Sequence, residues 1–206
     1  MKKILAITLF TSLFISSQSK ATEQLQYTVL ENEGRIEVRD YDDYLMASVT
    51  YKTKKEYEEN AFKTLFKYIS GDNTNSQDID MTAPVIINDS TKIPMTAPVF
   101  INQDLKEKVY EMSFVLPSFY TYSTAPRPLD SNIVITKVPR QLKASIRFSG
   151  FMSARKTKKY TNMLVEWIME DGRFKAISSP LIAGYNSPMT PPFLRRNEII
   201  IAIDYK

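Results

Sequence analysis

The 206-residue sequence contains no histidine and no cysteine. These absences exclude a Ser-His-Asp triad, a Cys-His pair, a thiolate metal site, an iron–sulfur cluster, a disulfide and a histidine-ligated haem built from this chain alone. Hydrophobic residues make up 43% and charged residues 24%, which is ordinary for a globular chain and too apolar for a disordered one. Chemistry that uses carboxylates, lysine, tyrosine or serine stays open.

The amino-terminal segment (residues 1–21) has the three-part layout of a secretory signal peptide. A start with two lysines is followed by the uncharged apolar run Ile4–Ile15 and by small residues up to Ala21. This run is shorter than the ~20 residues that a membrane-spanning helix needs. We predict cleavage after Ala21, a mature chain of residues 22–206 without a membrane-inserted segment, and secretion, with the bacterial periplasm as the expected location.

The charge distribution argues against a nucleic-acid partner. The formal net charge is +4, but three of the 27 basic residues and none of the 23 acidic residues lie in the leader. The remaining chain is nearly neutral and lacks the clustered basic patch that a nucleic-acid surface needs. The basic run Arg155–Lys159 would attract an acidic ligand, but a solvated helix start is the favoured interpretation. We also expect a monomer.

An internal repeat organises the mature chain. Residues 36–49 align with residues 133–146 at a constant offset, with Ala-Ser at the same place in both stretches. Apolar residues alternate in each stretch, which predicts a strand with one face toward a core. A helix with a wide apolar face follows, and then further strands. We predict an α+β fold in which two β-β-α-β-β units share one core within a single domain.

Caps and periodicity place the two helices. Thr53 and Glu56 form a capping box, after which apolar residues recur at helical spacing until Gly71. The second helix shows the same spacing and ends at Gly172. The proline-rich stretch Pro117–Pro128 is the predicted connector between the two units.

The tract Met-Thr-Ala-Pro-Val occurs twice, as residues 81–85 and 95–99, with a turn composition between the copies. This predicts a hairpin or two facing segments, with an edge or a bulge at each proline, because proline cannot donate to a ladder. A looser copy precedes the last predicted strand. The methionines Met81, Met95 and Met189 either line a soft apolar pocket or fill gaps in the core, and the core is the favoured interpretation.

Three motifs together resemble the SOUL/haem-binding protein family. They are the doubled Met-Thr-Ala-Pro-Val, the helix end Lys67–Asn73, and the segment Ala183–Glu198, which reads AGYNSPMTPPFLRRNE. The resemblance runs from about Tyr27 to Ile203. It implies a distorted β-barrel or paired antiparallel sheet flanked by two helices, in agreement with the two predicted units.

The resemblance also implies binding of haem or another tetrapyrrole without catalysis. The family's apolar groove lies between the first helix and the loop before the last strand. Its contacts would fall on Phe62 and Phe66 of the helix and on Met189 and Thr190 of the loop. Thr190 stands where some members have a basic residue that contacts the propionates.

Haem presents a large apolar ring, two carboxylates and an iron. Phe62 and Phe66 would supply stacking area, and Arg195 and Arg196 would pair with carboxylates through their forked donors. Iron ligation would come from Tyr185, from a methionine or from no protein side chain, and no metal site is predicted. The alternatives are that the two phenylalanines belong to the core and that the two arginines are structural.

Two other classes of function stay open. One is a SOUL-fold protein-interaction or envelope module that has lost haem binding, which the uncharged Thr190 favours. The other is an enzyme based on carboxylates such as Asp40, Asp42 and Asp43, but these lie at a strand–turn junction, where acids are ordinary turn formers. We therefore predict no catalytic residues, and expect an exported binder of haem or another planar hydrophobic small molecule.

Overall fold

The computed structural model describes residues 23–90, 109–187 and 189–206. The elements are, in chain order, β1 (Tyr27–Glu33), β2 (Ile36–Tyr41), β3 (Tyr44–Tyr51), α1 (Lys54–Ile69), β4 (Thr82–Ser90), β5 (Val109–Val115), β6 (Ile133–Val138), β7 (Gln141–Phe148), α2 (Ala154–Asp171), β8 (Phe174–Ala176), β9 (Leu181–Gly184), the short 3-10 helix η1 (Pro192–Leu194) and β10 (Asn197–Tyr205). Each α-helix stands between pairs of strands, as the sequence predicts. Among the described residues, no helix combines the length and apolarity needed to cross a bilayer.

The strands form one antiparallel sheet with the order β1-β2-β7-β10-β9-β4-β5-β3-β6, and β8 pairs with β10 beside this path. From β2 to β6 this order is symmetric about its centre. The run β2-β7-β10-β9, read from one end, corresponds to the run β6-β3-β5-β4, read from the other. The first strand of each repeated unit pairs with the other half, since β2 lies beside β7 and β6 beside β3. Strands from both halves therefore build a single sheet, which confirms the predicted α+β class.

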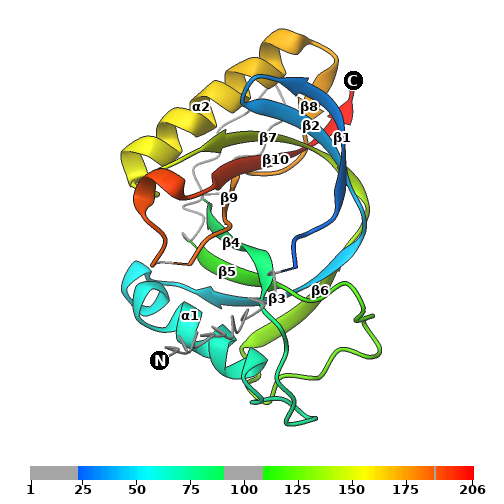
Figure 1. Cartoon of the computed structure of the whole chain (residues 1–206), viewed down its shortest axis with the longest axis vertical. Coiled ribbons are helices and arrows are strands. Elements are labelled where there is room, and N and C mark those ends of the chain that lie inside the picture. The colour runs from blue at the N-terminus through cyan, green and yellow to red at the C-terminus, as the bar shows by residue number, and fades with distance from the viewer. Residues whose placement is uncertain (1–22, 91–108, 188) are drawn as a thin grey trace, which may run out of the picture.

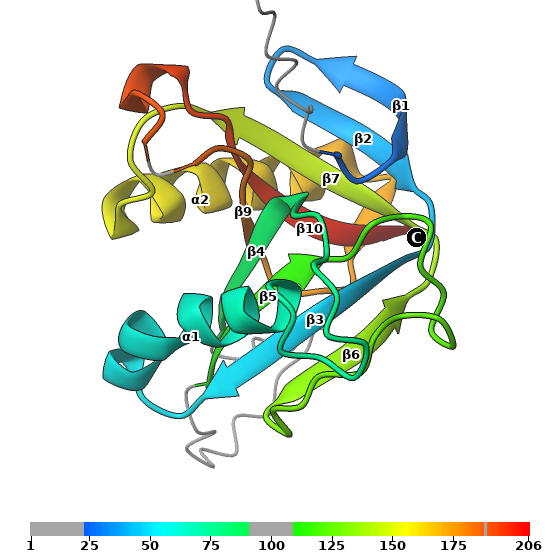
Figure 2. The ribbon, with the colours of Figure 1, turned by 60° about the horizontal axis from the view of Figure 1, so that its bottom comes forward.

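The sheet curls around an interior, and both helices lie on its outer side (Figures 1 and 2). One apolar core lies between α1 and the sheet, where Leu65 and Phe114 are buried. A second core lies between α2 and the sheet, where Leu164 and Ile201 are buried. Because the apolar residues of each strand alternate, the opposite side chains point into the interior of the curl.

Local sequence sets the helix ends as predicted. Thr53 Oγ1 accepts a hydrogen bond from the backbone N–H of Glu56 at 3.3 Å and donates to the Glu56 carboxylate at 2.8 Å. At the other end of α1, Gly71 has a φ of 101°, and the next amide, of Asp72, donates to the Lys67 carbonyl at 3.0 Å. This is the glycine-containing stop expected after a helix. Gly172, with a φ of 75°, ends α2 in the same left-handed region.

The helix-end motif holds the loop that follows α1. Asn73 is 1% exposed, and its side-chain amide donates to the carbonyls of Tyr68 (3.0 Å) and Gln77 (2.8 Å). Its side-chain oxygen accepts from the backbone amides of Asn75 and Gln77, both at 3.2 Å. This part of the family motif therefore has a structural role, because one buried side chain satisfies four backbone groups.

The first copy of the doubled tract enters β4. The register of β4 against β5 shifts around Pro84, which confirms the predicted bulge. Met81 is 38% exposed, so the favoured core interpretation is wrong for it. The second copy (residues 95–99, with Met95) and the leader (residues 1–21) lie outside the described residues.

Candidate functional site

A cleft of about 530 Å³ lies between the two helices, with the sheet as its floor. Its lining comes from α1 (Lys54, Tyr57, Glu58), α2 (Ala154, Thr157, Lys158, Thr161), the strands (Ile87, Tyr110, Ile182) and the adjoining loops (Met152, Ser179, Pro180). The cleft exists because both helices pack on the same side of the sheet. Its volume falls in the range of small-molecule pockets, about 300–1,000 Å³.

The rim of this interhelix cleft is positively charged. Lys54 and Lys158 contribute ammonium groups, and Glu58 contributes a carboxylate. Lys54 Nζ lies 3.4 Å from Glu58 on the same helix face, whereas Lys158 has no ion-pair partner among the described residues. An anionic ligand would find one uncompensated charge here.

The predicted contacts Phe62 and Phe66 continue the α1 face that carries Glu58, one and two turns further on. Their rings stack with centroids 5.8 Å apart, and Phe62 meets the buried Phe114 edge-on at 5.5 Å. They are 45% and 49% exposed, so the core alternative is wrong for both. Other α1 residues, such as Leu65, already fill the contact with the sheet, which leaves this aromatic pair at the surface.

The loop before β10 carries exposed apolar side chains. Met189 is 90% exposed, so the favoured core interpretation is wrong for this methionine as well. The neighbouring exposed residues are Phe193, Leu194 and, from the connection between β7 and α2, Phe151 and Met152. We call these five residues the apolar loop cluster. Figures 1 and 2 place this loop on the same side of the molecule as both helices, and Met152 also lines the interhelix cleft.

Backbone hydrogen bonds fix the position of this loop. The Gly150 amide donates to the Pro192 carbonyl at 2.8 Å, and the Asn197 side chain donates to the Gly150 carbonyl at 2.8 Å. The predicted site residues Thr190 and Arg195 also meet here, because Arg195 Nε donates to the Thr190 carbonyl at 2.8 Å. The cluster is thus anchored at its base while its side chains stay exposed.

The predicted site residues Tyr185 and Arg196 lie elsewhere, in the interior of the curl. The Tyr185 hydroxyl donates to the Glu198 carboxylate at 2.8 Å, and Arg196 pairs with the same carboxylate at 2.8 Å. Arg39 adds a bidentate pair to Glu198 at 2.6 and 3.0 Å, and the Arg196 guanidinium covers the Tyr185 ring at 3.9 Å. Neither Tyr185 nor Arg196 lines the interhelix cleft. The sequence alone does not show that Tyr185 and Arg196 point into the interior while Thr190 and Arg195, close by in the chain, lie in the loop.

Glu198 is fully buried yet held in its charged form. Burial would raise the pKa of Glu198, but the hydrogen bond and charge of Arg39 and the charge of Arg196 hold that pKa below its usual value. Burial raises the pKa of Tyr185, so the hydroxyl keeps the proton that it donates. This interior network (Arg39, Tyr185, Arg196, Glu198) is therefore a structural unit with every charge paired.

For haem, the described residues fit the ring and its carboxylates better than the iron. They include no group of three or more histidine, cysteine, aspartate or glutamate residues that would hold a metal. Tyr185, one predicted iron ligand, is committed to Glu198. The thioether of Met152 lines the interhelix cleft, and that of Met189 is exposed.

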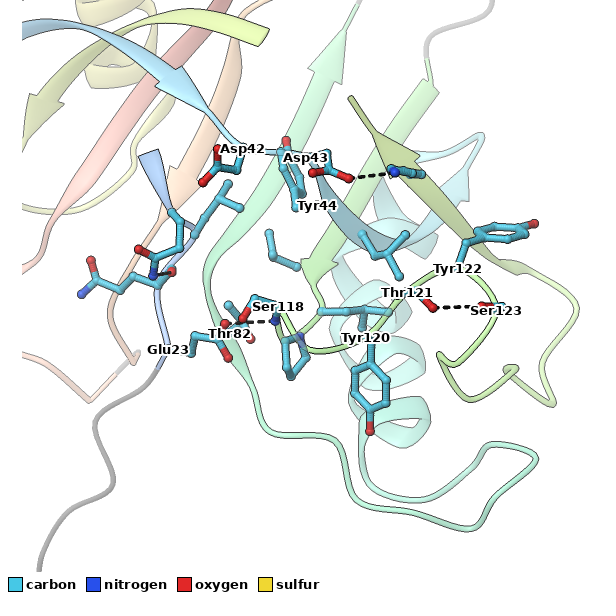
Figure 3. A pocket seen from close by; sticks show the side chains of 18 residues that line it. Glu23, Asp42, Asp43, Tyr44, Thr82, Ser118, Tyr120, Thr121, Tyr122 and Ser123 are labelled. Atoms are coloured by element: carbon cyan, nitrogen blue, oxygen red, sulfur yellow. Dashed lines mark hydrogen bonds and ion pairs between the residues drawn. The ribbon is translucent and has the colours of Figure 1, made fainter. Parts of the chain in front are cut away.

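A second large pocket, of about 520 Å³, lies beside residues 23–26 and the β2–β3 turn (Figure 3). Its lining holds the carboxylates of Glu23, Asp42 and Asp43 and one ammonium group, Lys137, which pairs with Asp43 at 2.8 Å. An excess of negative charge disfavours an anionic ligand there. Size alone does not distinguish the two pockets, but charge selects the interhelix cleft.

Two of the three carboxylates considered for catalysis, Asp40 and Asp43, have ordinary ion-pair partners. Arg140 donates to Asp40 at 3.0 Å and lowers the pKa of that carboxyl group, and a hydrogen bond from Lys137 lowers the pKa of Asp43. A general acid needs the opposite shift. These contacts give no support to the enzyme alternative.

Sequence reasoning missed Lys158 and Met152 as lining residues. Lys158 belongs to the basic run Arg155–Lys159, whose pattern favours a solvated helix start. The periodicity of α2 alone does not show that α1 lies across the cleft from Lys158. Met152 lies outside every motif, and no sequence signal marks it. Both positions depend on how the two halves of the chain come together.

Comparisons with known proteins identify the family of this chain. The model of the family described as SOUL heme-binding protein matches residues 22–202. Heme-binding protein 2 of Homo sapiens is 30% identical over 166 residues, which cover 80% of this chain and 75% of that protein.

Solved structures also share the fold. The EcmrR C-terminal domain has a TM-score of 0.55 at 12% identity, covering 86% of this chain and 98% of its own. A hydrolase from Listeria innocua has a TM-score of 0.51 at 8% identity, covering 85% of this chain and 94% of its own. At these identities the likeness concerns the fold alone, which does not decide function. The family match, over nearly the whole sequence, carries more weight: the chain belongs to the SOUL heme-binding protein family.

Proposed function

We propose that this protein binds haem or a related planar, hydrophobic anion in the interhelix cleft, without catalysing a reaction. The observation that carries the proposal is the stacked, half-exposed pair Phe62 and Phe66. The pair does not line the cleft, but it continues the α1 face of the lining residue Glu58, and the cleft has an unpaired ammonium group at Lys158. Family membership supports haem as the ligand class.

Apolar contact is the main source of affinity in this proposal. Buried apolar area contributes roughly 25 cal/mol per Å², and a well-oriented aromatic pair adds about 0.5–1.5 kcal/mol. An exposed ion pair between Lys158 and a propionate adds only about 0.2–1 kcal/mol. Haem brings a coloured, redox-active iron, while this chain's residues bind the ring and orient its carboxylates. We therefore expect weak to moderate affinity.

Export and a single mature domain are part of the proposal. The leader pattern in residues 1–21 supports cleavage after Ala21. The single sheet with strands from both halves supports one domain, residues 22–206, derived from an internal duplication. Mass spectrometry of the protein from a periplasmic extract tests the first point, because an uncleaved amino terminus would contradict it.

A haemin titration of the mature protein, followed by the Soret band, tests the binding proposal. We expect a saturable shift in the wild type and an affinity about tenfold lower, ~1.4 kcal/mol, in the double variant Phe62→Ala/Phe66→Ala. Phe119→Ala is the matched control, since Phe119 is 67% exposed and lies in the β5–β6 connection rather than on α1. Metal-free protoporphyrin should bind within a few-fold of haemin, because no imidazole ligates the iron.

Two results would contradict haem binding in the cleft. One is a wild-type titration without a saturable shift. The other is a double variant that binds haemin as tightly as Phe119→Ala does.

The apolar loop cluster favours a second candidate function, docking of a protein partner. Phe193 and Leu194 are 75% and 61% exposed, and exposed apolar side chains that gather in one place often mark an interaction surface. Thr190, without a charge, fits this function as well. Recovery of one stoichiometric partner that Phe193→Ser/Leu194→Ser no longer binds, together with a flat haemin titration, would support docking over haem binding.

A further inference from the structure

The interior of the curled sheet contains a lysine whose charge is not balanced. Lys143, on β7, is 3% exposed. Its Nζ donates to the Tyr44 hydroxyl at 2.8 Å and lies 4.9 Å from the ring centroids of both Tyr41 and Tyr44. Among the described residues, no carboxylate lies within ion-pair distance of Lys143. A buried ammonium group without a counter-charge is costly, so this arrangement calls for a partner.

The neighbouring charges do not supply that partner. Arg39 lies directly opposite Lys143 in the β2–β7 register, and it is itself paired with Glu37 and Glu198. Arg196 shares Glu198. Of the cations Arg39, Arg196 and Lys143, the first two are thus ion-paired, whereas Lys143 has no carboxylate within ion-pair distance among the described residues.

A cavity of about 200 Å³ adjoins Lys143. Its other lining residues are Tyr44, Met46, Ile86, Glu111, Val138, Gln141, Ile177, Ser178, Leu181 and Ala202. Most of these residues are apolar, and the polar ones besides Tyr44 are Glu111, Gln141 and Ser178. Ile177 is 54% exposed, so the cavity reaches the surface at the β8–β9 connection. The volume equals that of roughly seven water molecules at about 30 Å³ each, which is too small for a tetrapyrrole.

We propose that this interior cavity is a second binding site, which takes a small organic monocarboxylate with an apolar body. The carboxylate pairs with Lys143 Nζ and accepts a hydrogen bond from the Tyr44 hydroxyl, whose oxygen already accepts from the lysine. The apolar body lies against Met46, Ile86 and Leu181. A cationic ligand is disfavoured, because Lys143 and Arg39 would both repel it.

The ionisation of the lining is compatible with such a ligand. Burial lowers the pKa of Lys143 to about 8, so the ammonium form predominates at pH 7. Burial also raises the pKa of Glu111, the carboxylate in the same lining. The pKa of Tyr41 is raised to about 12 by burial, so this facing phenol stays neutral while Lys143 titrates.

This site is independent of the proposed haem function. None of Phe62, Phe66 and Lys158 lines the interior cavity, and the methionines report on the two sites separately. Met46 lines the interior cavity, whereas Met152 lines the interhelix cleft. A methyl-labelled methionine spectrum therefore shows which site a ligand occupies.

The test uses benzoate as the probe, with benzyl alcohol as its uncharged analogue, on the mature protein with ¹³C-methyl methionine. We expect benzoate to shift the Met46 methyl signal saturably while Met152 stays in place, and benzyl alcohol to bind at least tenfold more weakly. Lys143→Leu should weaken benzoate binding by at least tenfold. Lys175→Leu, which removes a lysine that is paired with Asp204 on the outside, should bind like the wild type.

The pH dependence gives a further readout on the wild type alone. Benzoate affinity should fall by about tenfold per pH unit above about pH 8, as Lys143 loses its proton. A Met46 signal that does not move up to about 10 mM benzoate, tenfold above the millimolar range of weak ligands, would overturn the proposal. Equal binding of benzyl alcohol, or undiminished binding to a folded Lys143→Leu variant, would overturn it too. If haemin shifts the Met152 signal but benzoate does not shift the Met46 signal, the interior site is refuted while the cleft site is supported.

Discussion

The interhelix cleft and the interior of the curled sheet both combine aromatic rings with basic side chains, but at opposite degrees of burial. Beside the cleft, Phe62 and Phe66 on α1 are about half exposed, and Lys54 and Lys158 lie at a solvated rim. In the interior, Arg39 and Glu198 are 2% and 0% exposed, and Tyr185 is hydrogen-bonded to the carboxylate. Water screens charges at the rim of the cleft much more than in the interior of the sheet. Basic and aromatic residues at the rim therefore adjust ligand affinity, whereas the same residue types in the interior stabilise the fold.

Removing one charge of the interior network should have the largest effect. Glu198→Gln leaves Arg39 and Arg196 without their shared counter-charge, so we expect the free energy of unfolding to fall by about 3–5 kcal/mol. Urea denaturation measures this. The control is Arg140→Gln, which breaks the exposed pair with Asp40 and should cost far less, because water screens an exposed ion pair. Similar losses in the two variants would contradict the distinction between interior and surface charge.

The same network should make the fold sensitive to acid. The pKa of Glu198 is lower in the folded state than the ordinary value of 4.5, so its stabilising contribution is present above pH 4.5 and is lost as the pH falls through the folded-state pKa. Stability curves below pH 4.5 should therefore be steeper for the wild type than for Arg39→Met/Glu198→Met.

Lys143 should produce a pH dependence of the same sign in an alkaline window, with a smaller effect. Its pKa is lowered from 10.5 to about 8 in the folded state, so the unfolded chain binds more protons between these values. Stability should rise with pH across this window, by up to about 3 kcal/mol at 1.36 kcal/mol per pKa unit. Lys143→Leu should lack the rise, and denaturation at pH 7.5 and pH 10 measures it. Parallel curves for both proteins would show that Lys143 is not held unpaired in the interior.

The smallest effect should come from the rim of the cleft. Lys158→Gln should lower haemin affinity by only a few-fold at low salt, which corresponds to less than about 1 kcal/mol. The difference from the wild type should vanish near 1 M salt, where the Debye length is about 3 Å. Lys175→Gln serves as the control away from the cleft. A salt-independent or much larger loss would place the Lys158 charge in a buried contact with the ligand.

Several features of this protein follow from the sequence by itself. The capping residues Thr53 and Glu56, the glycine after α1 and the alternation in β3 are local, because they depend on backbone geometry and on the period of nearby residues. The bulge at Pro84 also follows from local chemistry, since proline lacks the N–H that a ladder needs. The motifs that identify the family are likewise read directly from the chain.

Only the tertiary structure decided which polar residues face a ligand and which are locked inside. Arg195 and Arg196 are neighbours in sequence, yet the first lies with the loop and the second joins the interior network. That network depends on Arg39 and Glu198 meeting across 159 positions of sequence, and on β2 pairing with β7 of the other half. Periodicity shows which residues share a face, but only the packing of distant segments shows what covers that face.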